Sequence, residues 1–339
     1  MSDVVVIGAG AMGSATAWWL ARRGVDVVLL EQFEPGHTRG SSHGASRIFR
    51  LAYDDPVYVR MAQASLPLWR ELEEDAGEPL LDTTGSIDHG APDDVNATAA
   101  ALDACHATYE RLTDEQARER WPAFRFVGDV LFHPDGGRCR ADATVAALQR
   151  RAAAHGADVR FNQRAVLHIH DDHVDVITAD ATLTAAVAVV TAGAWVTDVL
   201  GEHAPNVVVT QEQVQHFAPR VEQEWPSFIH HRRPWIYGLL TPGEGVKVDD
   251  HHVGPVVHPD HRRPRSEELQ HAVVRYVEEW MPGLDPTPTH TTECLYTTTP
   301  DESFVLERRG PVVIGSPCSG HGFKFTPLIG QRLADLAMQ

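Results

Sequence analysis

The sequence predicts an α/β (α+β) fold, in which a first domain is assembled from separated segments and a second domain is built on a mainly antiparallel sheet. Three observations predict this fold: an apolar strand followed by a glycine-rich turn at the N-terminus, alternation of strand-like and helix-like segments along the chain, and two interruptions rich in proline and aromatic residues. At 339 residues the chain exceeds the size at which one hydrophobic core usually stops growing, so about two domains are expected.

The opening stretch DVVVIGAGAMGSATAWWLARRGVDVVLLEQF is typical of a β-α-β unit. The β-branched run Val4–Ile7 predicts a strand, a helix continues to about Arg23, and a second strand ends at Glu31. The run Val4–Ala21 carries no charge, but its three glycines and the lack of a basic segment before it argue against a membrane span or a signal peptide. We expect this run to be folded interior.

Within this unit the spacing G-x-G-x-x-G predicts a dinucleotide site. Gly8 permits the tight turn, Gly10 lets a pyrophosphate approach the backbone, and Gly13 lets the helix pack closely on the strand. Glu31 follows Gly13 by eighteen residues, where a carboxylate can accept hydrogen bonds from both ribose hydroxyls. The carboxylate disfavours NADP, whereas FAD and NAD share the fingerprint and both remain open. The domain is therefore expected to be Rossmann-like.

Later segments show the same alternation of helix and strand patterns as the first β-α-β unit. A helix is expected over Ala143–His155, a stop at Gly156 and a strand from Asp158, and a buried strand ends at Gly193. Residues 311–337 predict a further strand, a glycine-containing turn and a terminal helix. We assign 1–83, 141–204 and 292–339 to the nucleotide-binding domain. Residues 84–140 and 205–291, which include an alternating strand at Val207–Phe217, are assigned to the substrate-binding domain.

Charge and cysteine content exclude several classes of partner. The chain has 29 Lys+Arg against 47 Asp+Glu, a formal charge of −18, which disfavours nucleic acids and anionic membranes. The four cysteines lie far apart without a C-x-x-C pair, which argues against a disulfide framework or a zinc site and favours the cytoplasm. Histidines and carboxylates do cluster at 249–252 and at His168 and His170, but no ligand spacing completes a site, so no metal is predicted.

Four separated motifs resemble one family of flavoenzymes. They are the opening fingerprint, HTRGSSHGASRIFRLAY (His37–Tyr53), ECLYTTTPDESF (Glu293–Phe304) and CSGHGFKF (Cys318–Phe325). In this order, and over nearly the whole chain, they are similar to the monomeric sarcosine oxidase family, which includes N-methyltryptophan oxidases, within the D-amino acid oxidase group. The resemblance implies that the dinucleotide is FAD and that the protein is a monomeric amine oxidase.

The resemblance also implies that Cys294 is bonded to FAD by a thioether. Taken alone, this cysteine would more often be a small buried hydrophobe. The attacking species is a thiolate, which requires surroundings that lower the pKa of the thiol. Cys105, Cys139 and Cys318 keep a structural interpretation.

Further site residues follow from the same resemblance. Arg50 and Lys324 match a clamp for the substrate carboxylate. Arg47 matches an arginine that lies against the flavin, and if its segment is helical, positions 47 and 50 share one face. Lys247 matches the lysine on which O2 is activated, although an alternating strand around it would also allow it simply to face solvent. The remaining members of the predicted site are His251, Tyr296 and Tyr237 near the substrate, and Ser42, Gly320, His321 and Gly322 near the cofactor.

The expected reaction is oxidation of the C–N bond of a small N-substituted or cyclic α-amino acid to an imine, with O2 reduced to H2O2. One departure puts the substrate in doubt: relatives carry consecutive tyrosines where this chain has Ile236 and Tyr237. Sarcosine, larger N-methyl amino acids, pipecolate or proline analogues and glycated amino acids all remain open. Alternatives are a flavin-dependent dehydrogenase that uses another electron acceptor, an NAD-dependent dehydrogenase, and a flavoprotein retained as a binding module.

Overall fold

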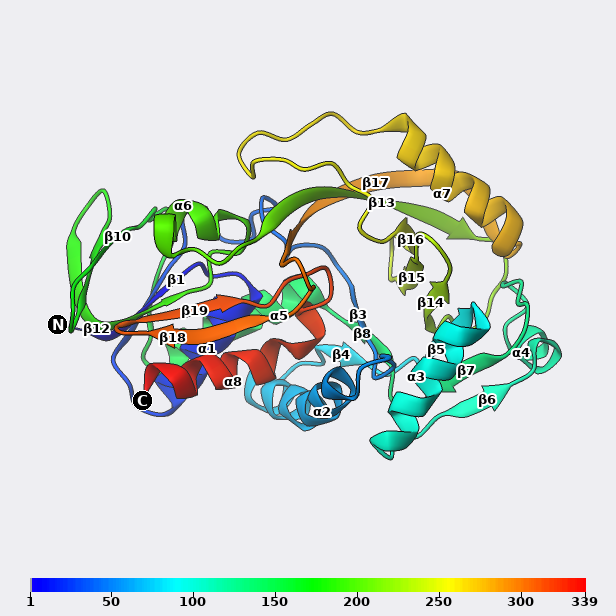
Figure 1. The fold of residues 1–339 in the computed structure, drawn as a ribbon, viewed down its shortest axis with the longest axis horizontal. Helices are drawn as coiled ribbons and strands as arrows, with labels where there is room; N and C mark the ends of the chain where they lie inside the picture. The colour runs from blue at the N-terminus through cyan, green and yellow to red at the C-terminus, as the bar shows by residue number, and fades with distance from the viewer. Residues whose placement is uncertain (1) are drawn as a thin grey trace.

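The computed structural model describes residues 2–339. Figure 1 shows a long molecule with one sheet at the end that holds both termini and a second sheet at the other end. Two long strands, β13 (Val208–Pro219) and β17 (Leu284–Thr298), run side by side from the first end towards the second.

The sheet near the termini has eight strands and a parallel centre. Its path is β10-β11-β12-β1-β2-β9, with β19 beside β12 and β18 beside β19. The pairs β12–β1, β1–β2, β2–β9 and β12–β19 are parallel, and the other pairs are antiparallel. The strands are β1 (Ser2–Ile7), β2 (Val27–Leu30), β9 (Asp158–Arg160), β10 (Val166–Ile169), β11 (Val174–Ile177), β12 (Thr182–Val190), β18 (Val305–Arg309) and β19 (Val312–Ser316).

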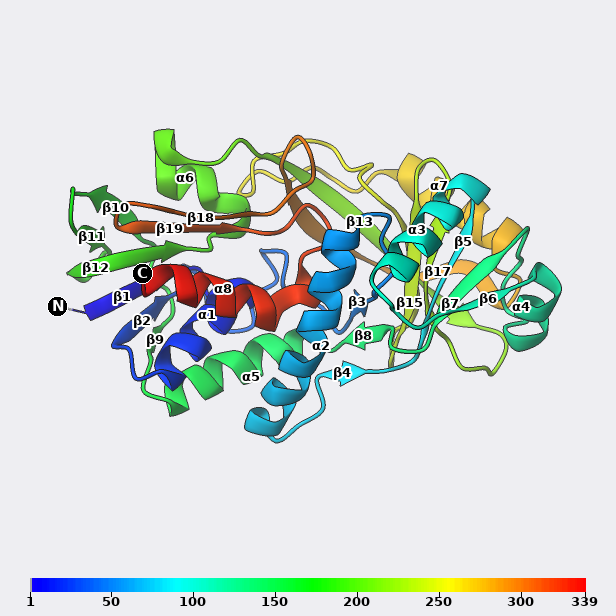
Figure 2. The same cartoon turned by 60° about the horizontal axis from the view of Figure 1, so that its bottom comes forward.

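Helices cover both faces of this sheet. On one face, α1 (Ala11–Arg22) lies between α5 (Ala141–Ala154) and α8 (Thr326–Ala337), as Figure 2 shows. On the other face lie the short helix α6 (Val196–Leu200) and the 3-10 turns η1 (Gly193–Trp195) and η2 (Gly201–His203). Alternate side chains of β1 enter the two different core clusters on these faces. Burial on both faces explains why the opening strands are continuously apolar.

The uncharged N-terminal run is therefore folded interior, as predicted. Ten of the residues in α1 are buried, because the helix packs on the sheet and on two other helices. Among residues 2–339, no helix is both long and apolar enough to cross a membrane.

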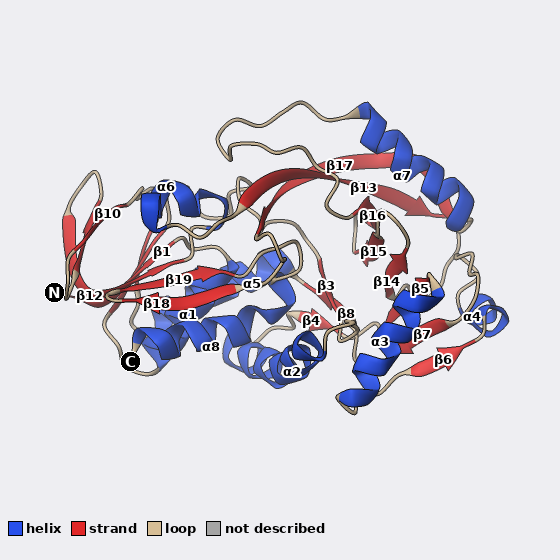
Figure 3. Ribbon diagram, viewed as in Figure 1, coloured by secondary structure: helices blue, strands red, loops and turns tan. Residues whose placement is uncertain are grey.

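The second sheet is mainly antiparallel, as predicted. Its order is β17-β13-β16-β15-β14-β5-β7-β6, and only β14 and β5 pair in parallel. The further strands are β5 (Ser86–Gly90), β6 (Glu110–Leu112), β7 (Val130–His133), β14 (Ser227–His231), β15 (Ile236–Thr241) and β16 (Gly245–Asp250). Its helices are α3 (Pro92–Ala104), α4 (Asp114–Arg120) and α7 (Glu267–Trp280), and Figure 3 shows α7 along the outer side of β13 and β17.

A small third sheet, β3-β8-β4, lies where the chain passes between the two large sheets. It consists of β3 (Arg47–Phe49), β4 (Leu81–Asp82) and β8 (Gly137–Cys139), next to the long helix α2 (Pro56–Ala76).

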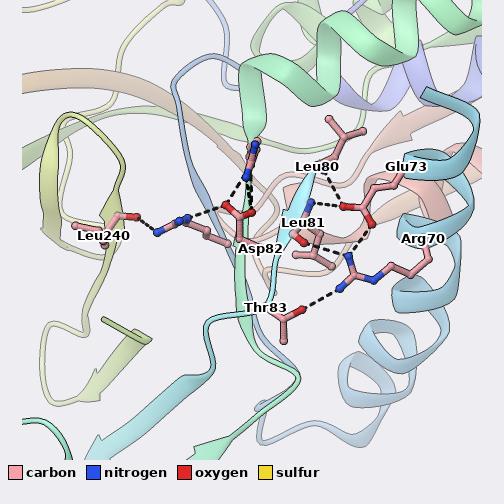
Figure 4. A network of polar contacts seen from close by, with 9 residues as sticks. Arg70, Glu73, Leu80, Leu81, Asp82, Thr83 and Leu240 are labelled. Carbon is pink, nitrogen blue, oxygen red and sulfur yellow. Dashed lines mark hydrogen bonds and ion pairs between the residues drawn. The ribbon is translucent and has the colours of Figure 1, made fainter. Parts of the chain in front are cut away.

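Charged hydrogen bonds hold this small sheet, and Figure 4 shows them. The Asp82 carboxylate accepts from Arg138 Nε at 3.0 Å and from Arg140 Nη2 at 2.7 Å, while Arg138 Nη1 donates to the Leu240 carbonyl on β15. On α2, Glu73 Oε1 accepts from the backbone N–H groups of Leu80 and Leu81. These bonds connect α2, the small sheet and the large antiparallel sheet.

The expectation that Arg47 and Arg50 share a helix face is wrong. Arg47 lies on β3, which pairs with β8 about ninety residues later in the chain. Cross-strand hydrogen bonds outweigh the weak helical preference of this segment. Because the segment is a strand, Arg47 and Arg50 do not share the face of a helix.

Candidate cofactor and substrate site

One cavity of about 600 Å³ brings most of the predicted site residues together. All the predicted residues except Gly13 line it, although they come from both large sheets and from the small one. Its lining includes Gly8, Gly10, Glu31, Ser42, Arg47, Arg50, Tyr237, Lys247, His251, Cys294, Tyr296, Gly320, His321, Gly322 and Lys324.

At the nucleotide end, one position in the turn after β1 and one in the first turn of α1 have room only for glycine. Gly8 has a φ of +96°, and a Cβ there would lie 2.6 Å from the carbonyl oxygen of Thr191. A Cβ at Gly13 would lie 1.9 Å from the Gly8 carbonyl oxygen. The tight turn and the close helix approach predicted from the glycine spacing are thus both present.

The side chains of Glu31 and Ser42 form hydrogen bonds with backbone N–H groups in and near this turn. The Glu31 carboxylate, 6 % exposed, accepts hydrogen bonds from the backbone N–H groups of Ala9 (2.8 Å) and Phe33 (3.1 Å). Ser42 Oγ accepts from the backbone N–H of Ala11 at 3.0 Å, at the first residue of α1. Glu31 therefore shapes the turn as well as lining the cavity.

Two cations and a thiol gather in the middle of the cavity. Arg47 donates to the backbone carbonyls of Ser41, His43 and Ser46, so its guanidinium is held in place by the loop before β3. Lys247 Nζ donates to the Ser46 carbonyl at 3.3 Å, and this side chain is only 7 % exposed. The alternative in which Lys247 faces solvent is therefore wrong.

Burial and the neighbouring charges shift the pKa values of Lys247 and Cys294. Desolvation, followed by the charge of Arg47, lowers the pKa of Lys247 to about 7. Burial raises the pKa of the Cys294 thiol to about 11, although Arg47 and Lys247 act in the opposite direction. The expected lowering of the cysteine pKa is thus not found in the protein by itself, because removal of water outweighs the two cations.

At the substrate end, Arg50 and Lys324 both lie near the ring of Tyr53. The Arg50 guanidinium carbon is 4.1 Å from the ring centroid of Tyr53, and Lys324 Nζ is 5.5 Å from it. Arg50 donates to the Ala52 carbonyl and Lys324 to the His321 carbonyl. Burial, followed by Arg50, holds the pKa of Lys324 well below its usual value. A carboxylate between these groups would relieve their repulsion.

Histidines and tyrosines line the space beside this cationic pair. Tyr296 Oη lies 3.4 Å from His251 Nδ1, and Tyr237 Oη donates to Asp249 at 3.5 Å. Burial keeps the pKa of both His251 and His321 well below the usual value, so both rings are neutral. The wall is therefore polar but carries no positive charge of its own.

The turn before α8 approaches these rings closely. Gly320 has a φ of +73°, and a Cβ there would lie 2.7 Å from atoms of His251 and of Tyr296. A Cβ at Gly322 would lie 1.7 Å from the Pro317 carbonyl oxygen. Lys324 follows in the 3-10 turn η3 (Phe323–Phe325), which leads into α8.

Sequence reasoning missed a buried carboxylate behind the clamp. Asp88 on β5 is 0 % exposed and lies 3.6 Å from Arg50, and it accepts from His133 Nε2 and His231 Nε2, both at 2.9 Å. A charged residue inside the short strand SIDHG was the available signal. Its partners lie about forty and one hundred and forty residues away, so only the fold identifies them.

The metal clusters considered from the sequence differ from those found among residues 2–339. Two groups have ligand atoms within 4.8 Å of one another: His170, His173 and Asp175, and His216, Glu244 and His290. In each group two imidazole rings stack nearly parallel, 4.2 Å and 4.1 Å apart. Ring planes in this arrangement do not direct two nitrogen lone pairs at one point. The absence of a metal stays a prediction.

The cavity fits an FAD. Its lining includes the turn between β1 and α1 with Gly8, a position that has room only for glycine, and the Glu31 carboxylate and the Ser42 hydroxyl lie beside the start of α1. The same lining includes the Cys294 thiol, Arg47 and the Gly320 turn. These residues would hold the dinucleotide at the turn and the flavin near the thiol, where the chemistry that FAD supplies is two-electron transfer.

Comparison with known proteins agrees with this site. The family model for FAD dependent oxidoreductases (DAO) matches residues 3–336. The chain is 35% identical to human peroxisomal sarcosine oxidase and 33% identical to monomeric sarcosine oxidase from Streptomyces avermitilis, in both cases over 99% of this chain and 92% and 93% of the relative. The open form of NikD, described as an unusual amino acid oxidase essential for nikkomycin biosynthesis, superimposes with a TM-score of 0.89 at 29% identity, covering 100% of this chain and 94% of that one. The chain therefore belongs to the DAO family of FAD-dependent oxidoreductases.

Proposed function

We propose that this enzyme oxidises the C–N bond of a small N-substituted or cyclic α-amino acid to an imine and reduces O2 to H2O2. The observation that carries the proposal is the pair of buried cations, Arg50 and Lys324, in the same cavity as the dinucleotide turn. The names of the two sarcosine oxidases support it.

Arg50 and Lys324 would bind the substrate carboxylate. When the site is free, burial, followed by the charge of Arg50, lowers the pKa of Lys324. An anion placed between them offsets this repulsion and restores the charge of Lys324. The clamp would thus fix the orientation of the α-carbon, which is the main contribution that binding makes to rate.

The same charges favour the reactive form of the amine. Only the uncharged amine has the lone pair that oxidation requires, and the two cations repel an ammonium group. His251 and His321 are neutral and Tyr296 has its pKa raised well above the usual value by burial, so these side chains add no anion next to the clamp. The substrate amine would therefore lose its proton on binding.

Lys247 would assist the reduction of O2. A bound FAD would supply the two-electron transfer from the amine to O2, and the two protons that the amine loses would end in H2O2. Lys247, buried and with a pKa near 7, can stabilise the anion that develops on oxygen and can also give up a proton near neutral pH. The imine is released and is hydrolysed by water.

An anaerobic screen of the holoenzyme tests this function. We expect at least one N-methyl or cyclic α-amino acid to bleach the flavin absorbance without O2, and to yield one H2O2 per turnover in air. If an amino acid bleaches the flavin but no peroxide forms in air, the enzyme is a dehydrogenase that uses another electron acceptor. If no amino acid bleaches the flavin, the proposed reaction is wrong.

We also propose that Cys294 holds FAD covalently. Its thiol lines the cavity, and Arg47 and Lys247 are the charges that favour the thiolate there. We expect acid-precipitated wild-type protein to retain the yellow flavin in the pellet, whereas Cys294→Ala should release it into the supernatant. The matched variant Cys318→Ala, also at the cavity, should behave as wild type. Release of flavin from the wild-type protein would contradict the bond.

We further propose that the enzyme acts as a monomer in the cytoplasm on a small molecule. The four cysteines are unpaired in the described structure, which is compatible with a reducing compartment.

A further inference from the structure

A second cavity, of about 490 Å³, meets the first one at the carboxylate clamp. Arg50, Trp235, His251 and His321 line both cavities, so a substrate held by Arg50 can extend into the second space. An N-methyl group or the ring of a small cyclic amino acid is far smaller than this volume. The space therefore suits a substrate with a long side chain on its α-carbon.

The rim of the second cavity is acidic. Its lining contains five carboxylate residues, Asp54, Asp55, Asp94, Asp301 and Glu302, against two arginines, Arg50 and Arg332. Burial, followed by the charges of Asp55, Asp301 and Glu302, raises the pKa of the Tyr58 phenol, which also lines this cavity. A positive group at this rim would meet a negative potential from several sides.

Two of these carboxylates have no structural task in the described chain. Asp55 accepts from the Val57 N–H at the start of α2, Asp301 accepts from the Ser303 N–H, and Asp94 pairs with Arg233 at 3.1 Å. Asp54, by contrast, makes no hydrogen bond or ion pair within residues 2–339. The exposed Glu302 carboxylate makes a single ion-pair contact in the described chain, a long one of 3.9 Å to His252 Nε2. Both are thus free to interact with a ligand.

One wall of the second cavity contains a histidine that the buried carboxylate Asp88 holds in place. His231 is 4 % exposed and lines the second cavity, and its Nε2 donates to the Asp88 carboxylate at 2.9 Å. In the neutral ring this leaves Nδ1 as an acceptor, and this buried atom has no hydrogen-bond partner in the described structure. The ring of His231 is thus held in place by Asp88 and forms part of the wall of the second cavity.

The walls are aromatic, which also suits a cation. Tyr53, Tyr58, Phe304 and Trp235 line the space, and the rings of Tyr58 and Phe304 meet edge to face at 5.3 Å. Aromatic faces attract ammonium and guanidinium groups and pack against the methylene chain that carries them.

We infer that the second cavity binds the side chain of the substrate, and that this side chain ends in an amine or a guanidinium group. The inference rests on the proposed function, because it places the substrate carboxylate on Arg50. It narrows the substrate class to N-substituted α-amino acids with a basic side chain. The reactive amine and the basic group then lie in different surroundings: the first beside two cations, the second beside an acidic rim.

Three ligands that differ only at the far end of the side chain test the inference. Nα-methyl-lysine, Nα-methyl-norleucine and Nα-methyl-glutamate are titrated, in both enantiomers, into the anaerobic holoenzyme. The dissociation constant is read from the change in flavin absorbance, or from the concentration dependence of bleaching where bleaching occurs. We expect the lysine compound to bind roughly tenfold more tightly than the norleucine compound, and the glutamate compound to bind most weakly.

The double variant Asp54→Asn/Glu302→Gln should lower the lysine-to-norleucine ratio about fivefold, because two charges of the rim are lost. The control Glu222→Gln/Glu224→Gln changes the net charge equally at exposed positions outside both cavities, and it should keep the wild-type ratio. Equal affinity for the lysine and norleucine compounds would overturn the inference, whether or not they bleach the flavin. Preferential binding of the lysine compound without bleaching would support the cavity assignment and overturn the proposed reaction instead.

Discussion

Lysine occurs at only two positions of the sequence, Lys247 and Lys324, and both side chains line the main cavity. They are 7 % and 5 % exposed, whereas lysine is among the residue types most often found at the surface. All other basic side chains that are not histidine are arginine, which stays charged under all ordinary conditions. An ammonium group, in contrast, changes its pKa readily when it is buried. Both lysines therefore lie in the cavity, where an ammonium group whose pKa is changed by burial can take part in binding or proton transfer.

Replacement of Lys247 by methionine should slow the oxidative half-reaction about a hundredfold, since the variant lacks the cation that stabilises charge developing on O2. The reductive half-reaction should change much less, because the carboxylate clamp is intact. Stopped-flow absorbance of flavin reduction without O2, and of reoxidation with O2, measures the two steps separately. Similar slowing of both steps would contradict the role of Lys247.

The pH dependence of reoxidation follows from the same residue. Burial lowers the pKa of Lys247 to about 7, so the charged form is complete below that value and is lost as the pH rises through it. The rate constant for reoxidation should therefore fall as the pH rises past about 7. In Lys247→Arg, which keeps its charge, the rate constant should stay level over the same range. A matching fall in this variant would assign the titration to another group.

At the scale of single elements, the central strands of the antiparallel sheet carry a buried ion pair behind the clamp. Asp88 on β5 faces Arg50, and histidines from β7 and β14 donate to its two oxygens. These hydrogen bonds hold the pKa of Asp88 below its usual value although burial alone would raise it.

Asp88→Asn should reduce the free energy of unfolding by about 3 kcal/mol at pH 7, because it leaves Arg50 without its buried partner. Since the pKa of Asp88 is lowered in the folded protein, its contribution is complete above the ordinary value near 3.8 and is lost as the pH falls below it. The difference from wild type in urea unfolding should therefore narrow in acid. Asp129→Asn, which removes an exposed ion pair with Arg111, should cost well under 1 kcal/mol. An equal cost for both variants would show that the Asp88 pair is not stabilising.

Helices and strands could be predicted where the pattern that indicates them lies within a few neighbouring residues. The first strand, α1 and β2 follow from the periodicity and the glycine spacing, and the observed bounds Ser2–Ile7, Ala11–Arg22 and Val27–Leu30 confirm them. The segment around Arg47 is not the helix that would have placed positions 47 and 50 on one face, because its three-residue strand is formed by pairing with distant β8. Short strands of this kind depend on partners far away in the sequence.

At the scale of the whole molecule, the cavity is assembled from segments at both ends and in the middle of the chain. The opening turn comes from one large sheet, Lys247 and Cys294 from the other, and Arg47 from the small sheet between them. A bound cofactor that contacts all of them would hold the two sheets together.

Removal of FAD should therefore destabilise the protein. In Cys294→Ala the cofactor can be removed by dialysis and added back. With free FAD at a hundredfold excess over Kd, linkage predicts a gain of about 2.7 kcal/mol, which corresponds to a rise in Tm of about 4 °C for a chain of this size. Calorimetry of the same variant with and without FAD measures this. An unchanged Tm would mean that FAD does not bind across the two sheets.

The sequence by itself determined the tight glycine turn after the first strand and the identity of the family, since each depends on residues close together in a motif. Only the tertiary structure decided the environment of those residues: the raised pKa of Cys294, the buried partner of Arg50 and the second cavity beside the clamp. The physical reason is that burial and charge depend on which distant segments surround a side chain, and a linear pattern carries no record of these neighbours.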